Sequence, residues 1–346
     1  MNRHYGIDLL KIIAMLMVVM LHVMRHGGIT AALAKNSHSI SYGGEQLLNT
    51  FCLCAVNCFV LATGYVMGPR CFKWGRLVKL WGQVAYYSVL MTALAACFMP
   101  EGAIVLRDWI NAIMPISSNQ YWFMTMYFAL FCTMPVLNHI LRSIDRKGLL
   151  AVLFGGFILL SLYPTLLGKD LFGTRGGYSY LWFMYLYIAG GFAAMHLDAS
   201  RLKPQFLAGG GVMCAIISLA LQIISSQCSK VIGVGLGGWV TYSSSGIFMQ
   251  AFLLLLLMSR YERMAHAAER IIRWISPSVF AVYLIHDNAM AKQLIGFASM
   301  FEKVATYGTA HMLIAIVCSA MLIFCACVLL DLPRRCIKYL YGKAYK

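Results

Sequence analysis

Three ionisable side chains near the start of the chain have the types and the spacing of a catalytic site. Asp8, Lys11 and His22 lie in or just before an apolar run that extends from residue 12 to residue 24. Lys11 and His22 are eleven residues apart. In an α-helix this is three turns, so both side chains point the same way about 16 Å apart along the axis. A lysine binds anions and a histidine acts as a general base near neutral pH, so we expect two sites on one helix face.

Each of these residues also has a structural interpretation. Lys11 can extend its ammonium group to the membrane surface, and His22 can hydrogen-bond to a neighbouring helix. Asp8 lies three residues before Lys11 and can pair with it on one helix face. Ionisable groups within an apolar span are costly and tend to mark functional sites, which favours the catalytic interpretation of His22.

A second group of charges lies between the second and third apolar runs. It consists of Arg70, Lys73, Arg76 and Lys79. Arg76 and Lys79 share one face at the start of a helix that enters the membrane. The group is either ordinary cytoplasmic charge or an anion site for phosphates, for which arginine and lysine are the natural donors.

Two later segments add further polar groups. His286 and Asp287 fall near the middle of an apolar segment over residues 275–296, and adjacent residues on a helix do not face each other. We therefore expect each to have a partner on another helix, either as a structural contact or as part of the site. Tyr121 and Trp122 open the fourth apolar run, where they form an interfacial belt or an aromatic platform for sugar rings.

Long apolar runs must position all these side chains. Hydrophobic residues make up 61% of the chain and charged residues 12%, against about 25% charged residues in a soluble domain. We predict an all-α polytopic membrane protein, a bundle of about ten transmembrane helices that forms one membrane-embedded domain over residues 1–346. The predicted spans are residues 10–25, 47–68, 77–98, 121–141, 149–166, 178–195, 206–225, 235–258, 275–296 and 310–331.

The distribution of charge predicts the topology. Most of the 28 Lys and Arg residues fall on one side of the ten spans, including Arg3, Lys11 and the C-terminal Lys338, Lys343 and Lys346. The positive-inside rule then places both termini in the cytoplasm. Attraction to anionic lipid explains most of the net charge of +16, so we expect a membrane-lipid partner and no nucleic acid. The 12 cysteines lie mostly in apolar runs without the spacing of a metal site, so we expect no metal.

Several of these residues also form motifs that resemble the integral membrane acyltransferase-3 family, which O-acylates cell-surface glycans. The first motif is Gly6-Ile7-Asp8-Leu9-Leu10-Lys11 running on to Leu21-His22, similar to the family's pattern of a basic residue, ten intervening residues and then histidine. The others are Thr63-Gly64-Tyr65, then Arg76 and Lys79, then Tyr121-Trp122-Phe123 leading to Pro135 and Asn138, and Ser278-Val279-Phe280-Ala281-Val282-Tyr283-Leu284-Ile285-His286. The resemblance covers essentially the whole chain.

The resemblance implies a ten-helix core in a bacterial cell membrane that carries an acyl group from cytoplasmic acyl-CoA to a hydroxyl at the outer face. The chain departs from the family in having lysine at Lys11, where arginine is commoner, and Lys79 as the second member of a basic pair. Lysine lacks the bidentate fork of arginine, so the donor contacts must differ in detail. Many relatives carry an extra soluble domain, and we expect none in this protein.

Residues and resemblance together predict a membrane-bound O-acyltransferase. His22 is expected to be the general base or a transient acyl carrier. Asp8, Lys11, Arg76 and Lys79 are expected to bind or support the donor, and His286, Tyr121 and Trp122 the acceptor. The donor substrate is expected to be acetyl-CoA, with no bound cofactor, and the acceptor a cell-surface or lipid-linked glycan. The alternative is a transporter or flippase for a surface-polysaccharide precursor, which would use the same intramembrane polar groups as a pathway.

Overall fold

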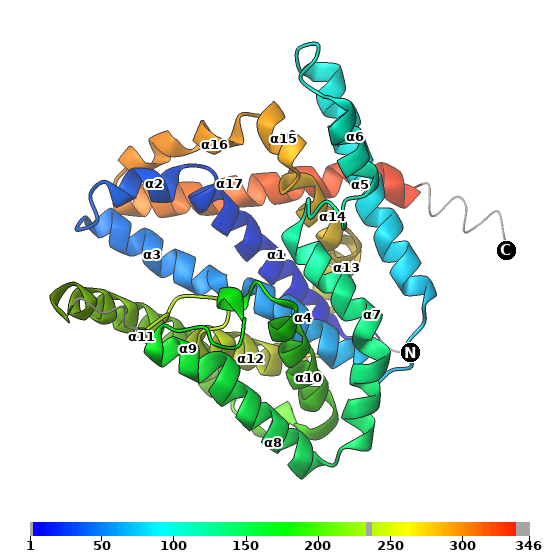
Figure 1. Ribbon diagram of the computed structural model, residues 1–346, viewed down its shortest axis with the longest axis vertical. Coiled ribbons are helices and arrows are strands. Elements are labelled where there is room, and N and C mark those ends of the chain that lie inside the picture. The colour runs from blue at the N-terminus through cyan, green and yellow to red at the C-terminus, as the bar shows by residue number, and fades with distance from the viewer. Residues whose placement is uncertain (1–2, 233–236, 337–346) are drawn as a thin grey trace. The chain divides into compact units, whose positions relative to one another are not determined.

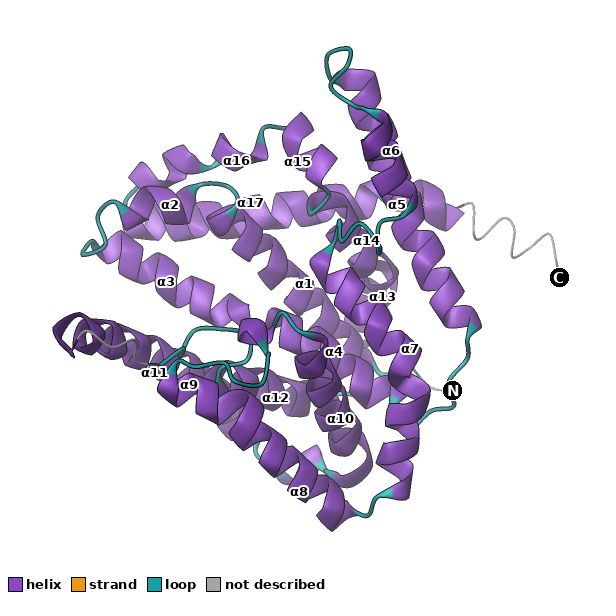
Figure 2. Ribbon diagram, viewed as in Figure 1, coloured by secondary structure: helices purple, strands orange, loops and turns teal. Residues whose placement is uncertain are grey.

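Helices and loops make up the whole of the described chain. The computed structural model describes residues 3–232 and 237–336, and within these ranges Figure 2 shows helices joined by loops and turns. Residues 235 and 236 of one predicted span, and the lysines at 338, 343 and 346, lie outside the described residues. The predicted all-α class is confirmed.

Among the described residues, seven helices are long and apolar enough to cross a membrane, whereas the sequence predicts about ten spans. The seven are Tyr5–Arg25, Ile40–Met67, Gly75–Phe98, Trp122–Ser143, Arg146–Leu167, Pro204–Ser229 and Thr309–Cys336. The remaining three predicted spans correspond to α10 (Tyr180–His196) with 17 residues, α12 (Ser245–Ser259) with 15, and a segment over 275–296 that is interrupted. The chain is a polytopic membrane protein, while the full number of spans and the cytoplasmic placement of both termini stay predictions.

The chain divides into two compact units, so its organisation as one domain stays a prediction. The first comprises Met1–Ala14, Gln46–Trp81 and Trp122–Ala265, and the second comprises Met15–Glu45, Gly82–Tyr121 and His266–Lys346. Three helices have residues in both units: α1 (Tyr5–Arg25), α3 (Ile40–Leu53) and α5 (Gly75–Phe98).

The first unit is built on a close contact between two helices. Besides its parts of α1, α3 and α5, this unit contains α4 (Ala55–Met67), α7 (Trp122–Ser143), α8 (Arg146–Phe157), α9 (Tyr163–Leu167), α10, α11 (Pro204–Ile232) and α12 (Figure 1). Helix α4 packs on α10, and a Cβ added at Gly64 would lie 2.1 Å from the Tyr187 carbonyl oxygen. Only glycine permits this approach, as is usual where small residues let membrane helices pack closely. This contact is the structural reason for glycine in the Thr63-Gly64-Tyr65 motif.

The second unit contains most of the short helices. They are α2 (Ile29–Ala34), α6 (Leu106–Ile113), α13 (His266–Ile275), α14 (Val279–His286), α15 (Ala289–Leu294) and α16 (Phe297–Met300), with the long α17 (Thr309–Leu330) packed on α14. Asp331, fully buried after α17, accepts hydrogen bonds from Tyr87 and from Arg334, whose Nε lies 2.6 Å away. A paired carboxylate of this kind is the form in which a buried charge is tolerated.

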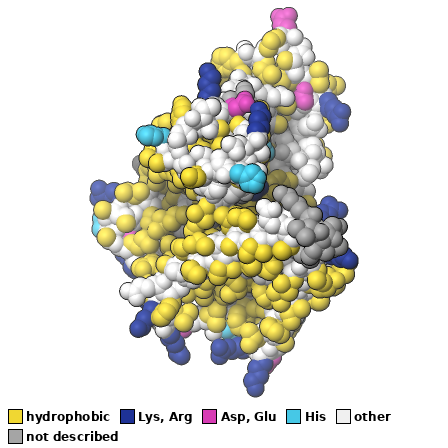
Figure 3. Space-filling model, turned by 90° about the vertical axis from the view of Figure 1, so that its left-hand side faces the viewer, with side chains coloured by type: hydrophobic (Ala, Val, Ile, Leu, Met, Phe, Trp, Pro, Cys, Tyr) yellow, Lys and Arg dark blue, Asp and Glu magenta, His cyan; other side chains and the backbone are white. Residues whose placement is uncertain are grey.

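The surface has the character of a lipid-facing protein. Figure 3 shows apolar side chains covering much of the face in view. Exposed apolar residues include Ile216, Ile217 and Ile224 on α11 and Met321 and Leu322 on α17. Such extensive apolar exposure would be a liability in water and is expected in a bilayer.

Candidate active site

The segment at 275–296 is not one helix, because it breaks at Asp287 and Asn288. Helix α14 ends at His286, Asp287 is its C-terminal cap, and Asn288 begins α15. The Asn288 side-chain oxygen accepts hydrogen bonds from the backbone N–H groups of Met290 (2.9 Å) and Ala291 (3.2 Å). This is ordinary asparagine N-capping, which offers the backbone an alternative to a continuous helix. The break therefore places Asp287 at a helix end.

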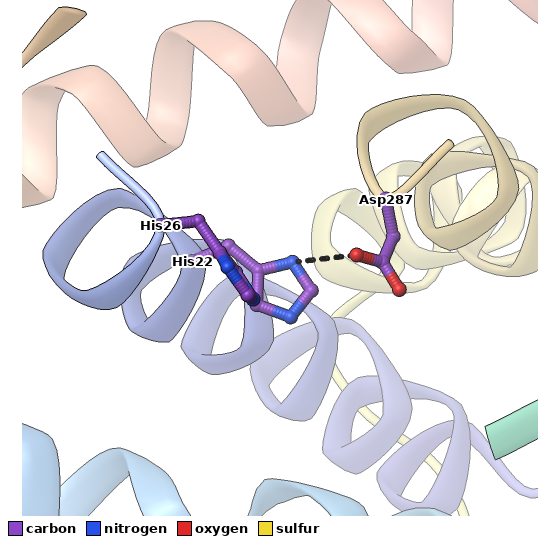
Figure 4. Close-up of side chains that lie close together, drawn as sticks. All are labelled: His22, His26 and Asp287. Carbon is purple, nitrogen blue, oxygen red and sulfur yellow. Dashed lines mark ion pairs between the residues drawn. The ribbon is translucent and has the colours of Figure 1, made fainter. Parts of the chain in front are cut away.

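The Asp287 carboxylate lies between two basic side chains. Its Oδ1 is 2.9 Å from Lys292 Nζ and 3.6 Å from His22 Nδ1, and Figure 4 shows the second of these contacts, between α1 and the end of α14. The side chains of His22 and Asp287 are only 15% and 10% exposed. A carboxylate at a helix C-terminus meets the negative end of the helix dipole, so the Lys292 ammonium and the imidazole offset an unfavourable position. The expectation that Asp287 has a partner on another helix is confirmed.

Three histidine rings gather at this point. The His22 ring centroid lies 4.8 Å from that of His26 and 4.9 Å from that of His286. His286 Nδ1 is 2.6 Å from the Val282 carbonyl, so Nδ1 donates and Nε2 is left as an acceptor. Among the described residues, His22 Nδ1 and His286 Nε2 are buried nitrogens without a hydrogen-bond partner. Buried polar atoms of this kind are costly and require an explanation, such as a ligand.

The end of α1 fixes the position of His22. His22 lies in the last turn of α1, and its carbonyl accepts hydrogen bonds from the N–H groups of His26 (2.9 Å) and Gly27 (3.0 Å). Gly28 then has a φ of 91°, a left-handed conformation that favours glycine. The unpaired carbonyls at the end of a helix stabilise positive charge, so this location suits an imidazole that takes up a proton during a reaction.

A cavity of about 430 Å³ opens beside the histidines. Its lining includes His26 and Lys292. Partial burial lowers the pKa of the His26 imidazole; the Lys292 ammonium lowers it further, while the Asp287 carboxylate raises it. His26 is therefore a neutral hydrogen-bonding group near pH 7. The cavity has the volume of a small-molecule site.

His22, His26 and Asp287 are also the described residues whose ligand atoms could hold a metal ion, since these atoms lie within 4.8 Å of one another. A tetrahedral zinc ion with bonds of about 2.0–2.1 Å requires its ligand atoms to be about 3.4 Å apart. A metal would also have to displace the Lys292 ammonium from Asp287. The side chains are arranged as an ion pair with adjacent imidazoles, and the expected absence of a metal stays a prediction.

The residues expected to bind the donor belong to the first unit. Lys11 is half-buried on α1 and close enough to Arg70 for their charges to act on each other. Arg76 is half-buried, with Nη1 2.9 Å from Met67 Sδ, and Lys79 is exposed one turn later on α5. The basic residues of this region therefore lie on α1, in the loop before α5 and in the first turns of α5, which is compatible with an anion site.

Asp8 does not form the expected ion pair with Lys11. Its Oδ2 lies 2.5 Å from Arg3 Nε, and the described residues contain no ion pair between Asp8 and Lys11. Arg3 precedes α1 and can bring its planar guanidinium onto the carboxylate, whereas Lys11 continues along the helix. Asp8 therefore acts on Lys11 only through the electrostatic attraction between their charges, without a direct contact.

A buried asparagine fixes the loop that carries Arg70. Asn138, on α7, donates hydrogen bonds to the carbonyls of Met67 and Arg70, each at 3.1 Å. Its side-chain oxygen accepts a hydrogen bond of 2.6 Å from Tyr187. Asn138, which belongs to one of the motifs that resemble the family, therefore positions the backbone of the loop that carries Arg70.

The two aromatic residues expected at the acceptor site have different surroundings. Tyr121 is 1% exposed; its hydroxyl donates to the Leu284 carbonyl (2.9 Å) and accepts from Asn288 Nδ2 (2.6 Å), so it holds the break between α14 and α15. Trp122 belongs to the first unit and stacks on Tyr242 with a centroid distance of 6.0 Å. Contact of either residue with an acceptor stays a prediction.

The structure adds His26 and Lys292 to the residues expected from sequence, and gives Asp287 a place beside His22. His26 follows His22 by four residues, which is one turn of the same helix face, and this spacing could have indicated it. Lys292 follows Asp287 by five residues, a spacing that indicates no contact in a continuous helix.

Comparison with known proteins identifies the family. A protein-family model described as an acyltransferase domain, Acyl_transf_3, matches residues 4–332, nearly the whole chain. A search of curated proteins and a search of solved structures each find no significant match. The matched range includes Lys11, Arg76 and Lys79 as well as the residues around His22. The chain therefore belongs to the acyltransferase 3 family of membrane acyltransferases.

Proposed function

We propose that the protein transfers an acyl group, acetyl in the simplest case, from cytoplasmic acyl-CoA to a hydroxyl of a cell-surface or lipid-linked glycan, as a multi-pass protein of the bacterial plasma membrane. The observation that carries the proposal is the Asp287 carboxylate facing Nδ1 of His22 beside a cavity. An imidazole that faces a carboxylate with one nitrogen presents the other nitrogen to substrate, which is the arrangement of a general base.

The proposed reaction begins at His22 Nε2. This nitrogen takes the proton of the acceptor hydroxyl as the hydroxyl oxygen attacks the thioester carbonyl carbon. The tetrahedral intermediate then expels the CoA thiolate, which takes the proton from the imidazolium. The ester forms, the thioester breaks and His22 returns to its neutral state. Asp287 and the end of α1 stabilise the positive charge that His22 carries between the two proton transfers.

The donor is proposed to bind through its phosphates to Lys11, Arg76 and Lys79. Lys11 and His22 lie on one continuous helix, so the length of α1 between them is about 16 Å. An extended pantetheine arm following this helix would carry the thioester from the phosphate site towards His22. His286 Nε2, a buried acceptor without a described partner, would orient the acceptor sugar by accepting a hydrogen bond from a second hydroxyl, next to the one that reacts.

The central experiment compares glycan acylation by the wild type and by His22→Asn. Cells expressing each protein are analysed by mass spectrometry of their surface glycans. We expect His22→Asn to abolish the added acyl mass. His38→Asn, the same substitution at an exposed histidine of the second unit, should leave the acyl mass on the glycans unchanged. Acylation that persists in a folded His22→Asn protein would contradict the catalytic role.

A second measurement tests whether His22 is a base or an acyl carrier. Purified protein is mixed with labelled acetyl-CoA without acceptor, quenched and digested. Label on the peptide that contains His22 would indicate a covalent intermediate, whereas a base leaves that peptide unlabelled. Uptake of a glycan precursor without thioester loss would instead support a transporter.

The donor site is tested with two donors that differ in their phosphates. Arg76→Met should raise the KM for acetyl-CoA about 10- to 100-fold, since a charge-assisted hydrogen bond contributes about 1.5–3 kcal/mol. The KM for S-acetylpantetheine, which has no phosphate, should not change. Arg146→Met, at an exposed arginine of the same unit, is the control. Equal effects on both donors would exclude a phosphate contact at Arg76.

A further inference from the structure

The cavity beside the histidines has a distinct chemical character. It is lined by His26, Lys292 and Gln293 with Ala289, Phe297 and Ala298. His26, Gln293 and Ala298 are exposed, so the cavity opens at the surface, while Phe297 is 2% exposed and forms part of its apolar wall. A volume of about 430 Å³ accommodates a sugar residue with a substituent.

The lining carries one positive charge and no negative one. Lys292 is the cation, and no described lining residue is an aspartate or a glutamate. The Lys292 side chain is 26% exposed and uses one described contact, to Asp287 Oδ1. An ammonium group has three donors, so Lys292 has capacity for a further acceptor from the cavity. His26 and Gln293 add neutral hydrogen-bonding groups.

Asp287 connects this lysine to His22. The same oxygen, Oδ1, lies 2.9 Å from Lys292 Nζ and 3.6 Å from His22 Nδ1, so it is within hydrogen-bond distance of the lysine only. The Lys292 ammonium and the His22 imidazole therefore compete for one carboxylate oxygen. A group that draws the ammonium away from Asp287 allows the carboxylate to close on His22.

We propose that the cavity binds an anionic acceptor, a sugar bearing a carboxylate or a phosphate, whose charge pairs with Lys292 and thereby releases Asp287 to His22. This inference rests on the proposed function, because it names the acceptor class of that reaction. Binding and activation are coupled: an anionic acceptor engages Lys292 and obtains an oriented base, whereas a neutral sugar leaves Lys292 on Asp287. The lysine is thus a specificity-determining and positioning residue.

The test measures binding, which does not require turnover. Methyl glucuronide, glucose 1-phosphate and the neutral methyl glucoside are titrated into purified protein in nanodiscs. We expect at least one anionic probe to bind about tenfold or more tightly than the glucoside, as is usual for a charge-assisted contact. A preference for the glucuronide indicates a sugar acid, and a preference for the phosphate indicates a phosphorylated or lipid-phosphate-linked sugar; either supports the proposal.

Variants assign the preference to Lys292. Lys292→Gln should abolish it, and Lys303→Gln, at an exposed lysine of the same unit outside the cavity lining, should retain it. Asp287→Asn should strengthen anion binding, because the ammonium loses its internal partner; a purely structural role for the pair predicts no such gain. In the wild type alone, added salt should reduce the preference. This last measurement remains decisive if a variant does not fold.

Three results would overturn the inference: equal binding of all three probes or no binding, a preference that survives in Lys292→Gln, or weaker anion binding in Asp287→Asn. Each leaves the proposed function testable through His22→Asn. If that variant loses acylation while the probe preference is absent, only the anionic acceptor is wrong. If the preference holds but His22→Asn remains active, the catalytic role is wrong.

Discussion

Replacing Asp287 by asparagine should lower kcat without weakening donor binding. The carboxylate matters most when His22 is positively charged, which in the proposed reaction is near the transition state. At the observed separation of 3.6 Å, Coulomb's law with an effective dielectric constant of about 20 gives about 4.6 kcal/mol between the two charges. Each 1.36 kcal/mol is a factor of ten in rate, so the expected loss is about 2,000-fold.

The assay should follow CoA release by mass spectrometry. Thiol reagents are unsuitable, because Cys71, Cys97, Cys132 and several other free cysteines are exposed. The matched control is Asp331→Asn, which removes another buried carboxylate of the second unit, one that contacts Tyr87 and Arg334 instead of a histidine. This variant should lose stability, while the folded fraction keeps its kcat.

Three outcomes would refute the reasoning. If Asp287→Asn retains kcat within about threefold, the carboxylate does not stabilise a charged His22 in the rate-limiting step. If Asp331→Asn lowers kcat as much in folded protein, the effect comes from losing any buried carboxylate and not from the contact with His22. A change confined to the KM for acyl-CoA would likewise place Asp287 outside the chemical step.

Three further predictions concern other parts of the chain. Lys292→Gln should raise the pKa of His26, because a nearby ammonium disfavours the imidazolium; a histidine NMR titration measures this, and an unchanged or lower pKa would contradict the assigned cause. Gly64→Ala should destabilise the first unit by about 3 kcal/mol or more by overpacking against an α10 carbonyl, whereas Gly155→Ala, with open space around its Cβ, should be tolerated within about 1 kcal/mol in a thermal-unfolding assay. Asn138→Leu should cost about 2–4 kcal/mol in the same assay, because it leaves two carbonyls and a tyrosine hydroxyl without their partner, and an unchanged stability would show that water replaces the amide.

The sequence predicts the long helices well because their signal is local. Mean hydropathy over about twenty residues is enough to locate α1, α7 and α17. The same local geometry places Lys11 and His22 on a single helix, as the structure shows for α1. The bounds of short spans are predicted less well, because hydropathy does not report where a helix ends: α12 begins at Ser245, whereas the predicted span begins at residue 235.

The candidate site was only partly predictable, because its central feature depends on contacts that are distant in sequence. An apolar window over 275–296 contains no proline or glycine at 287 or 288 to mark a break. The break is held by the Asn288 cap and by the Tyr121 hydroxyl, 167 positions earlier in the chain. His22 and His286 are recognisable from the sequence as unusual residues in apolar runs. The contact of Lys292 with Asp287 is not, because it depends on the interruption of the helix between α14 and α15.

The interrupted helix explains how an aspartate inside an apolar segment acquires a lysine partner five residues later. In a continuous α-helix, residues five apart point about 140° away from each other, so Asp287 and Lys292 would lie on different faces. Asn288 ends one helix and starts the next, and the change of direction brings the ammonium to 2.9 Å from the carboxylate. The same break leaves Asp287 on the last turn of α14, within 3.6 Å of His22. A single capping asparagine therefore gives one carboxylate two competing partners: the Lys292 ammonium, which lines the cavity, and the buried His22 imidazole. The proposed control of His22 by a bound anion depends on this arrangement.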